Sequence, residues 1–122
     1  MQTTGGFRLD DIPWEPAQPD GTRSATLAGD RRPGTLFTYA FAIPPGWWDR
    51  PHSHPAAAHL VVVRGELRLG FGNALAPEAA RRYPAGSFLL VPAGAVHVDG
   101  AEEETVIIGT AVGPWSTDYA RA

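Results

Sequence analysis

Residues 35–46 alternate between large apolar side chains and smaller ones, which is the period-two pattern of a β-strand. The large positions of this stretch are Phe37, Tyr39, Phe41 and Ile43. Aromatic and β-branched residues at every second position favour a half-buried strand, so we expect this face to lie in the core. The sequence Pro-Pro-Gly at residues 44–46 ends the strand.

Further apolar runs follow along the chain, and turn-forming residues separate them at intervals of about eight to twelve residues. Residues 59–72 predict a hairpin, with a strand, a tight turn at Arg64-Gly65 and a second strand. Residues 87–100 predict two strands around a Pro-Ala-Gly turn, and residues 104–115 predict a last strand. This spacing, with no sustained helical period, indicates an all-β antiparallel sandwich or barrel.

The first 34 residues are polar and rich in turn formers, and prolines at positions 13, 16, 19 and 33 exclude a regular helix there. We expect residues 1–34 to form an irregular segment with one or two short edge strands, one of them within residues 24–29. Trp14 indicates that part of this segment packs on the barrel. Residues 35–122 would form the barrel, and the two parts together make one domain.

The composition and charge of the chain exclude several classes of partner and chemistry. The chain has 122 residues and a formal net charge of −3 with scattered basic residues, so we expect no nucleic-acid partner. No apolar run is long enough to span a bilayer, so we expect no membrane partner. The chain lacks cysteine, which excludes disulfides and thiolate chemistry. The N-terminus has no apolar segment of the signal-peptide type, and we expect a cytoplasmic protein.

Three of the four histidines lie close together, at positions 52, 54 and 59. Residues two apart on a strand point to the same face, so His52 and His54 can bind one cation. A third ligand must come from another strand, and His97 is the candidate outside this cluster. A pair of histidines two apart is a weak motif by itself, because histidines in β proteins commonly lie at the surface or in hydrogen bonds.

Two longer motifs carry a family resemblance. Residues 46–65 have the pattern G-x5-H-x-H-x3-A-x6-G, and residues 86–101 have the pattern G-x5-P-x-G-x2-H-x3-A. The spacing of both resembles the two motifs of cupins, and the chain is similar to small single-domain bacterial cupins. The resemblance implies an antiparallel jelly-roll β-barrel and a homodimer formed through paired barrel faces.

In cupins, the two histidines and the glutamate of the first motif and the histidine of the second usually hold a metal. The resemblance therefore implies that His52, His54 and His97 bind a metal, whereas the glutamate position falls on Ala58. A bulge after Pro55 could turn His59 inward as a replacement ligand. Strand parity favours the alternative, in which His59 points outward or lies behind the ligands.

Three neutral imidazoles leave the charge of a divalent ion uncompensated, so such a site would act as a strong Lewis acid and attract an anionic small molecule. The geometry suits Fe(II), nickel, manganese, zinc or copper. We expect a metal-dependent enzyme with dioxygenase-like chemistry, and an isomerase, lyase or cyclase is an alternative. A second alternative is a non-catalytic ligand-binding cupin with an eroded metal site, because Ala58 cannot bind a metal.

Strand parity from the histidines also predicts which side chains line the substrate pocket. The expected lining residues are Trp48, Arg50, Tyr39, Phe41 and Phe88, with Asp99 predicted from His97. The guanidinium of Arg50 could clamp a substrate carboxylate, and Asp99 and His59 are candidates for a general base. The plain alternative is core packing for the aromatic residues and a solvated surface position for Arg50.

Overall fold

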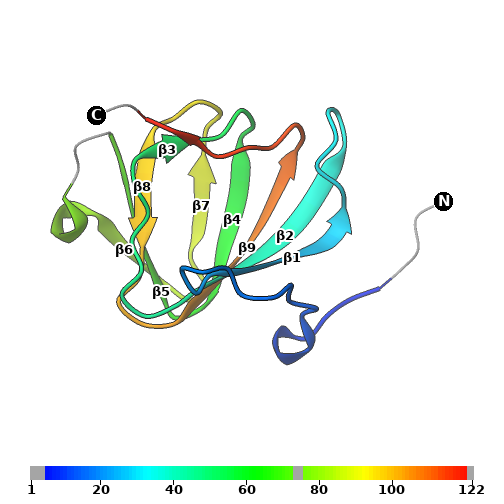
Figure 1. The fold of residues 1–122 in the computed structure, drawn as a ribbon, viewed down its shortest axis with the longest axis horizontal. Helices are drawn as coiled ribbons and strands as arrows, with labels where there is room; N and C mark the ends of the chain where they lie inside the picture. Colours follow the sequence, from blue (N-terminus) through cyan, green and yellow to red (C-terminus); the bar gives the residue numbers. More distant parts are fainter. Residues whose placement is uncertain (1–4, 73–75, 121–122) are drawn as a thin grey trace.

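The computed structural model describes residues 5–72 and 76–120. Its strands form two antiparallel five-stranded sheets that enclose a common core (Figure 1). The wall sheet contains, in spatial order, β1 (Arg23–Gly29), β2 (Leu36–Ile43), β9 (Thr105–Val112), β4 (Ala58–Arg64) and β7 (Phe88–Val91). The histidine sheet contains β10 (Asp118–Tyr119), β3 (His52–Ser53), β8 (His97–Gly100), β5 (Glu66–Phe71) and β6 (Arg81–Pro84). This architecture confirms the predicted all-β jelly-roll barrel.

The core lies between the inner faces of the two sheets. On β2, Phe37, Tyr39 and Ile43 are buried, and Phe41 packs against the same cluster, as the alternation along this segment predicts. Leu67 and Leu69 of β5 face them from the histidine sheet. Burial of these side chains stabilises the fold by about 1.5–3 kcal/mol for each large apolar residue.

The turn at Arg64-Gly65 does not make a hairpin, so that prediction was wrong. β4 pairs with β7 and β9, whereas β5 pairs with β6 and β8, and the chain therefore crosses from one sheet to the other at Gly65. Gly65 has a φ of 77°, and a Cβ there would collide with the carbonyl oxygen of Glu104. The residues at positions 64 and 65 favour a tight turn, but which strands pair depends on residues far away in the sequence.

The N-terminal segment packs on the barrel, and β1 adds an edge strand to β2. Ile12 and Ala25 are buried together with Ala40 of β2, and Leu9 and Trp14 pack against them. The segment also contains a short 3₁₀ turn, η1 (Leu9–Asp11), and a second one, η2 (Pro77–Ala79), precedes β6. In the described part of the chain, no helix has the length and apolar character needed to cross a membrane.

Candidate metal centre

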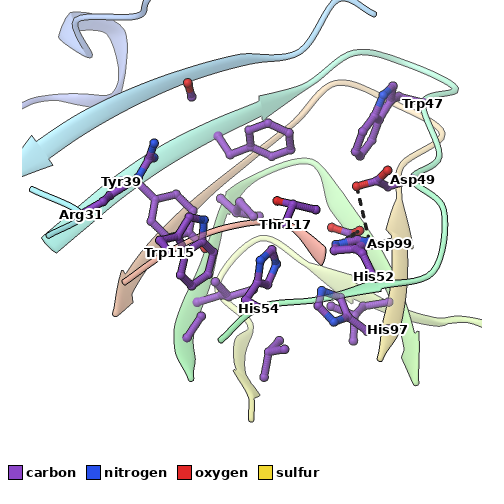
Figure 2. A pocket seen from close by; sticks show the side chains of 17 residues that line it. Arg31, Tyr39, Trp47, Asp49, His52, His54, His97, Asp99, Trp115 and Thr117 are labelled. Atoms are coloured by element: carbon purple, nitrogen blue, oxygen red, sulfur yellow. Dashed lines mark ion pairs between the residues drawn. The ribbon is translucent and has the colours of Figure 1, made fainter. Parts of the chain in front are cut away.

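His52, His54 and His97 converge at one end of the barrel (Figure 2). His52 of β3 pairs directly with His97 of β8, and His54 follows β3 by one residue. The ring centroids of His52 and His97 are 4.3 Å apart, and His54 lies 5.2 Å and 5.3 Å from them. One ring nitrogen of each histidine lies within 4.8 Å of the other two, which places them in reach of a single ion.

Each of the three rings is held by a backbone carbonyl. The Nδ1 atoms of His52, His54 and His97 lie 2.6, 2.8 and 3.0 Å from their acceptors. These acceptors are the carbonyl oxygens of Arg50, Ser116 and Ala95. Because a carbonyl can only accept, each Nδ1 must carry a hydrogen, which leaves Nε2 as the nitrogen that can bind a metal. This is the orientation that metal-binding histidines adopt.

The surroundings keep two of these rings uncharged. Burial lowers the pKa of His97 to about 4, and the neighbouring His52 and His54 lower it further against the hydrogen bond to Ala95. Burial also lowers the pKa of His54, although the carbonyl of Ser116 opposes the shift. Both imidazoles are therefore neutral at pH 7, as metal binding requires.

Two carboxylates flank His52. Oδ1 of Asp99 lies 3.6 Å from Nε2 of His52, and Oδ2 of Asp49 lies 3.5 Å from Nδ1 on the other side of the ring. Burial raises the pKa of Asp99 to about 6, while the charge of His52 lowers it and that of Asp49 raises it. Oδ1 of Asp99 is buried without a hydrogen-bond partner in the described part of the chain. Asp49, His52 and Asp99 form a group of possible ligands of their own, with ligand atoms within 4.8 Å of one another, and it is distinct from the group of three histidines. The three imidazole donors fit a divalent transition metal.

The histidines open into a cavity of about 200 Å³ between the two sheets. Its inner wall is apolar and is formed by Tyr39, Phe41, Ala58, Leu60, Val91 and Ile107. Trp115 stacks on the ring of His54 with 4.2 Å between centroids and 14° between planes, and Trp47 packs edge-on against Phe41. Figure 2 shows Arg31 and Tyr39 at the end of the cavity opposite His97. The cavity can therefore hold a small molecule between the histidines and Arg31.

Some of the residues expected in the pocket are there, and others are not. Tyr39, Phe41 and Asp99 line the cavity, but Trp47 does so in place of Trp48. Trp48 instead forms an isolated bridge with Gly100. The parity count failed because β3 contains only residues 52 and 53, so that no regular strand connects His52 to the preceding tryptophans.

Arg50 and Phe88 lie outside the cavity. The guanidinium of Arg50 is exposed and stacks 4.1 Å above the ring of Tyr119. Phe88 is 61% exposed on the outer face of β7, because β7 alternates and buries Leu89 and Val91 instead. The expectations of a substrate clamp at Arg50 and an apolar wall at Phe88 are therefore wrong.

His59 points away from the centre. β4 pairs without a bulge from Ala58 to Val62, so Ala58 faces the cavity and His59 faces outward. The ring of His59 packs edge-on against Phe88, with 5.8 Å between centroids. This placement removes His59 as a replacement ligand and as a general base for the cavity.

Sequence reasoning missed Asp49, Trp47, Trp115, Thr117 and Arg31 as lining residues. Asp49 and Trp47 come from the irregular segment before β3, where no periodicity shows which way a side chain points. Trp115 lies in the Gly-Pro-Trp stretch that ends the last long strand. The tryptophan itself could have indicated this packing, because large aromatic side chains bury much of their surface in folded proteins.

The chain resembles a known protein family and a plant protein in sequence. A family model described as "ChrR Cupin-like domain" matches residues 3–116. The germin-like protein subfamily T member 3 of Arabidopsis thaliana is 32% identical over 66 residues, which are 53% of this chain and 29% of that protein. The matching region therefore spans less than a third of the plant protein.

Solved structures share the fold. The polyketide cyclase RemF from Streptomyces resistomycificus has a TM-score of 0.72 and 16% identity, over 98% of this chain and 87% of that chain. KdgF from Halomonas sp. has a TM-score of 0.68 and 20% identity, over 88% of this chain and 94% of that chain. At these identities the likeness concerns the fold alone.

Proposed function

The chain belongs to the family of ChrR cupin-like domains, and from this premise we propose that it is a metal-dependent enzyme acting on a small anionic molecule. His52, His54 and His97 would hold one divalent transition metal. The supporting observation is that all three Nδ1 atoms donate to backbone carbonyls, which leaves three Nε2 lone pairs for one ion. When bound, the ion would supply Lewis acidity toward an oxygen of the substrate and a position for dioxygen.

Arg31 and Tyr39 support the anionic character of the substrate. The guanidinium of Arg31 borders the cavity and lies 5.4 Å from the centroid of the Phe37 ring, which leaves its N–H groups available to a carboxylate. Burial raises the pKa of Tyr39, and the charge of Asp99 raises it further, so the phenol keeps its proton at neutral pH. Arg31 would bind the anionic group, and the Tyr39 hydroxyl would donate a hydrogen bond to it.

Metal content tests the first part of this proposal. The protein is purified without chelator, reconstituted separately with Fe(II), nickel, manganese, zinc or copper, and analysed by mass spectrometry of the metal. We expect about one equivalent of bound metal for at least one ion. Less than about a tenth of an equivalent for all five ions would refute the proposed metal centre.

Reaction screening tests the second part. The reconstituted protein is incubated with small carboxylates and enolisable keto acids, while dioxygen consumption and product formation are followed. Dioxygen uptake would support the dioxygenase-like chemistry, and turnover without uptake would favour an isomerase, lyase or cyclase. Arg31→Ala should raise the KM for a carboxylate by about tenfold or more and leave its metal content unchanged.

Ala58 favours a second candidate function. It is buried against the cavity at the position where the first cupin motif has its glutamate, so the chain could be a ligand-binding domain with an eroded centre. In that case the His52→Ala, His54→Ala double variant should bind small carboxylates as tightly as the unmodified protein. Loss of ligand binding in this variant would count against the non-catalytic function.

The proposal includes a homodimer formed through the outer face of the wall sheet. Large apolar side chains are exposed on this face, and they include Leu36, Val61, Phe88, Leu90 and Val112. Exposed apolar side chains grouped on one face are typical of protein–protein contacts. Light scattering of the unmodified protein and of Phe88→Asp tests the proposal, and an unmodified protein that is monomeric at high concentration would overturn it.

A further inference from the structure

We propose that residues 115–120, here called the strap, hold His54 in the orientation in which it binds the metal, and that Tyr119 latches the strap to the barrel. The proposal rests on the metal centre proposed above and gives a role to residues outside the three histidines. The strap comes shortly after β9 and crosses the end of the barrel from the wall sheet to the histidine sheet (Figure 1).

The first residues of the strap contact His54 directly. The carbonyl oxygen of Ser116 accepts the hydrogen of Nδ1 at 2.8 Å, and the indole of Trp115 stacks on the imidazole with 4.2 Å between centroids. His52 and His97 differ, because each of them donates to a carbonyl two residues earlier in the chain. The orientation of His54 therefore depends on a carbonyl 62 residues away in the sequence, whereas the other two rings are held locally.

Trp115 also anchors the start of the strap to the wall sheet. Its ring centroid lies 5.6 Å from those of Phe37 and Tyr39, and both of these side chains are buried on β2. Contacts of this kind between aromatic rings add to the stability gained by burial. Movement of the strap away from His54 would therefore begin at its other end.

Tyr119 holds that other end of the strap. It belongs to β10, which contains two residues, lies at the edge of the histidine sheet and pairs with β3. The Tyr119 hydroxyl donates to Oδ1 of Asp49 at 3.1 Å, and the guanidinium of Arg50 lies 4.1 Å from the centroid of its ring. The N–H of Ala120 donates to the carbonyl of Pro51 at 2.9 Å. Because so short an edge strand has little stability of its own, these contacts decide whether the strap stays closed.

The metal and the strap act on the same ring, so their binding must be coupled. An ion bound to Nε2 of His54 favours the ring orientation that the carbonyl of Ser116 holds, and metal binding should therefore keep the strap closed. By thermodynamic linkage, loosening the strap should weaken metal binding by the same factor. Thr117 of the strap lines the cavity, so closure would also complete the wall around a substrate.

The test compares Tyr119→Ala with the matched control Tyr83→Ala in the full chain. Tyr83 lies on β6, the other edge strand of the same sheet, and the guanidinium of Arg81 lies 5.8 Å from the centroid of its ring. Tyr83 also packs against the core cluster, so its removal should cost at least as much global stability. A loss of metal affinity that reflects only general destabilisation would therefore appear in the control too.

Zn²⁺ affinity is measured by competition with a chromogenic chelator at pH 7.5, and hydrogen exchange of residues 115–120 is followed with and without Zn²⁺. We expect Tyr119→Ala to bind Zn²⁺ about tenfold more weakly, with Tyr83→Ala within about threefold of the unmodified protein. The strap of Tyr119→Ala should also exchange faster. Tyr119→Phe, which keeps the ring beside Arg50, should recover most of the affinity. In the unmodified protein, Zn²⁺ should slow exchange in the strap.

Unchanged Zn²⁺ affinity in Tyr119→Ala, or an equal loss in both alanine variants, would overturn the role of the strap while the three-histidine centre stands. Exchange in the strap that bound Zn²⁺ does not slow would overturn it as well. If Tyr119→Ala does not fold, Arg50→Ala replaces it. Removal of a positive charge by itself would strengthen cation binding, so an affinity that is not weakened in this variant would overturn the proposal. Absence of metal binding in the unmodified protein would refute the centre and, with it, this role.

Discussion

The two sheets of the barrel face one cavity but line it with different chemistry. The histidine sheet contributes His52, His97 and Asp99 from β3 and β8. The wall sheet contributes mainly apolar side chains, which are Tyr39, Phe41, Ala58, Leu60, Val91 and Ile107. Both sheets use the same alternation of inward and outward residues, so the difference comes from which residue types occupy the inward positions.

One sheet of this barrel serves as a packing surface, while the other carries most of the polar groups of the cavity. On the wall sheet, Tyr39 of β2 lies over Gly109 of β9, where a Cβ would collide with its ring. The neighbouring β4 places Ala58 inward and His59 outward, so this sheet offers no imidazole and no carboxylate to the histidines. The wall sheet shapes the cavity, and the histidine sheet supplies its electrostatics.

The largest effect is expected from removal of the adjacent histidines. His52→Ala combined with His54→Ala should weaken Zn²⁺ binding by about a thousandfold or more, because one imidazole cannot replace the chelate formed by three. His59→Ala is the matched control, since this ring lies on the outer face of β4, and it should bind Zn²⁺ normally. Chelator competition measures both. A full equivalent of tightly bound Zn²⁺ in the double variant would contradict the assignment.

The next effect concerns the wall sheet. Gly109→Ala would place a methyl group in the ring of Tyr39, and we expect a loss of about 3 kcal/mol in the free energy of unfolding. In a Tyr39→Ala background the ring is absent, so the same substitution should cost little. Urea unfolding of the four proteins measures this coupling. Equal costs in the two backgrounds would show that Tyr39 does not fill the space above Gly109.

The long regular strands could be predicted from the sequence, whereas the connections between them could not. The alternation of β2 and the direction of His59 followed from period-two parity, because β2 and β4 are continuous strands. Parity failed for Trp48 and Arg50, since the chain before His52 is irregular. The prediction of a hairpin at Gly65 was wrong, because a tight turn does not show whether the strands on its two sides pair with each other.

Only part of the candidate site could be predicted from the sequence. The spacing of the two motifs predicted that His52, His54 and His97 lie together, and in the structure their ring centroids lie within 5.3 Å of one another. The spacing could not show that each Nδ1 donates to a backbone carbonyl, because the acceptors lie on three separate segments. Nor could it place Arg31, which reaches the cavity from the loop between β1 and β2.

Acid should destabilise the histidine sheet through His97. Its pKa of about 4 in the folded protein lies below the unfolded value of 6.5, so between these pH values the unfolded chain binds more protons. The free energy of unfolding contributed by His97 is therefore intact above pH 6.5 and is lost as the pH falls toward 4. Allowing for solvent screening, we expect a loss on the order of 2 kcal/mol.

Asp99 acts in the opposite direction, so a variant is needed to isolate His97. The raised pKa of Asp99 makes its contribution more favourable as the pH falls from about 6 toward 3.8. Urea unfolding of the metal-free protein and of His97→Gln, at pH 7, 6, 5 and 4, separates the two. The difference between the proteins should shrink steadily toward acid pH. A constant difference would contradict the lowered pKa of His97.

The smallest expected effect comes from adding a carboxylate to the wall sheet. Ala58 of β4 borders the cavity across from the histidines, so a glutamate there would approach the centre from the wall sheet. Ala58→Glu should raise the Zn²⁺ affinity by about tenfold, since a carboxylate offsets part of the charge that three imidazoles leave on the ion. Ala58→Gln, which has the same size without the charge, is the control. If the glutamate and glutamine variants bind Zn²⁺ equally, a carboxylate at this position of the wall sheet does not contribute to the metal centre.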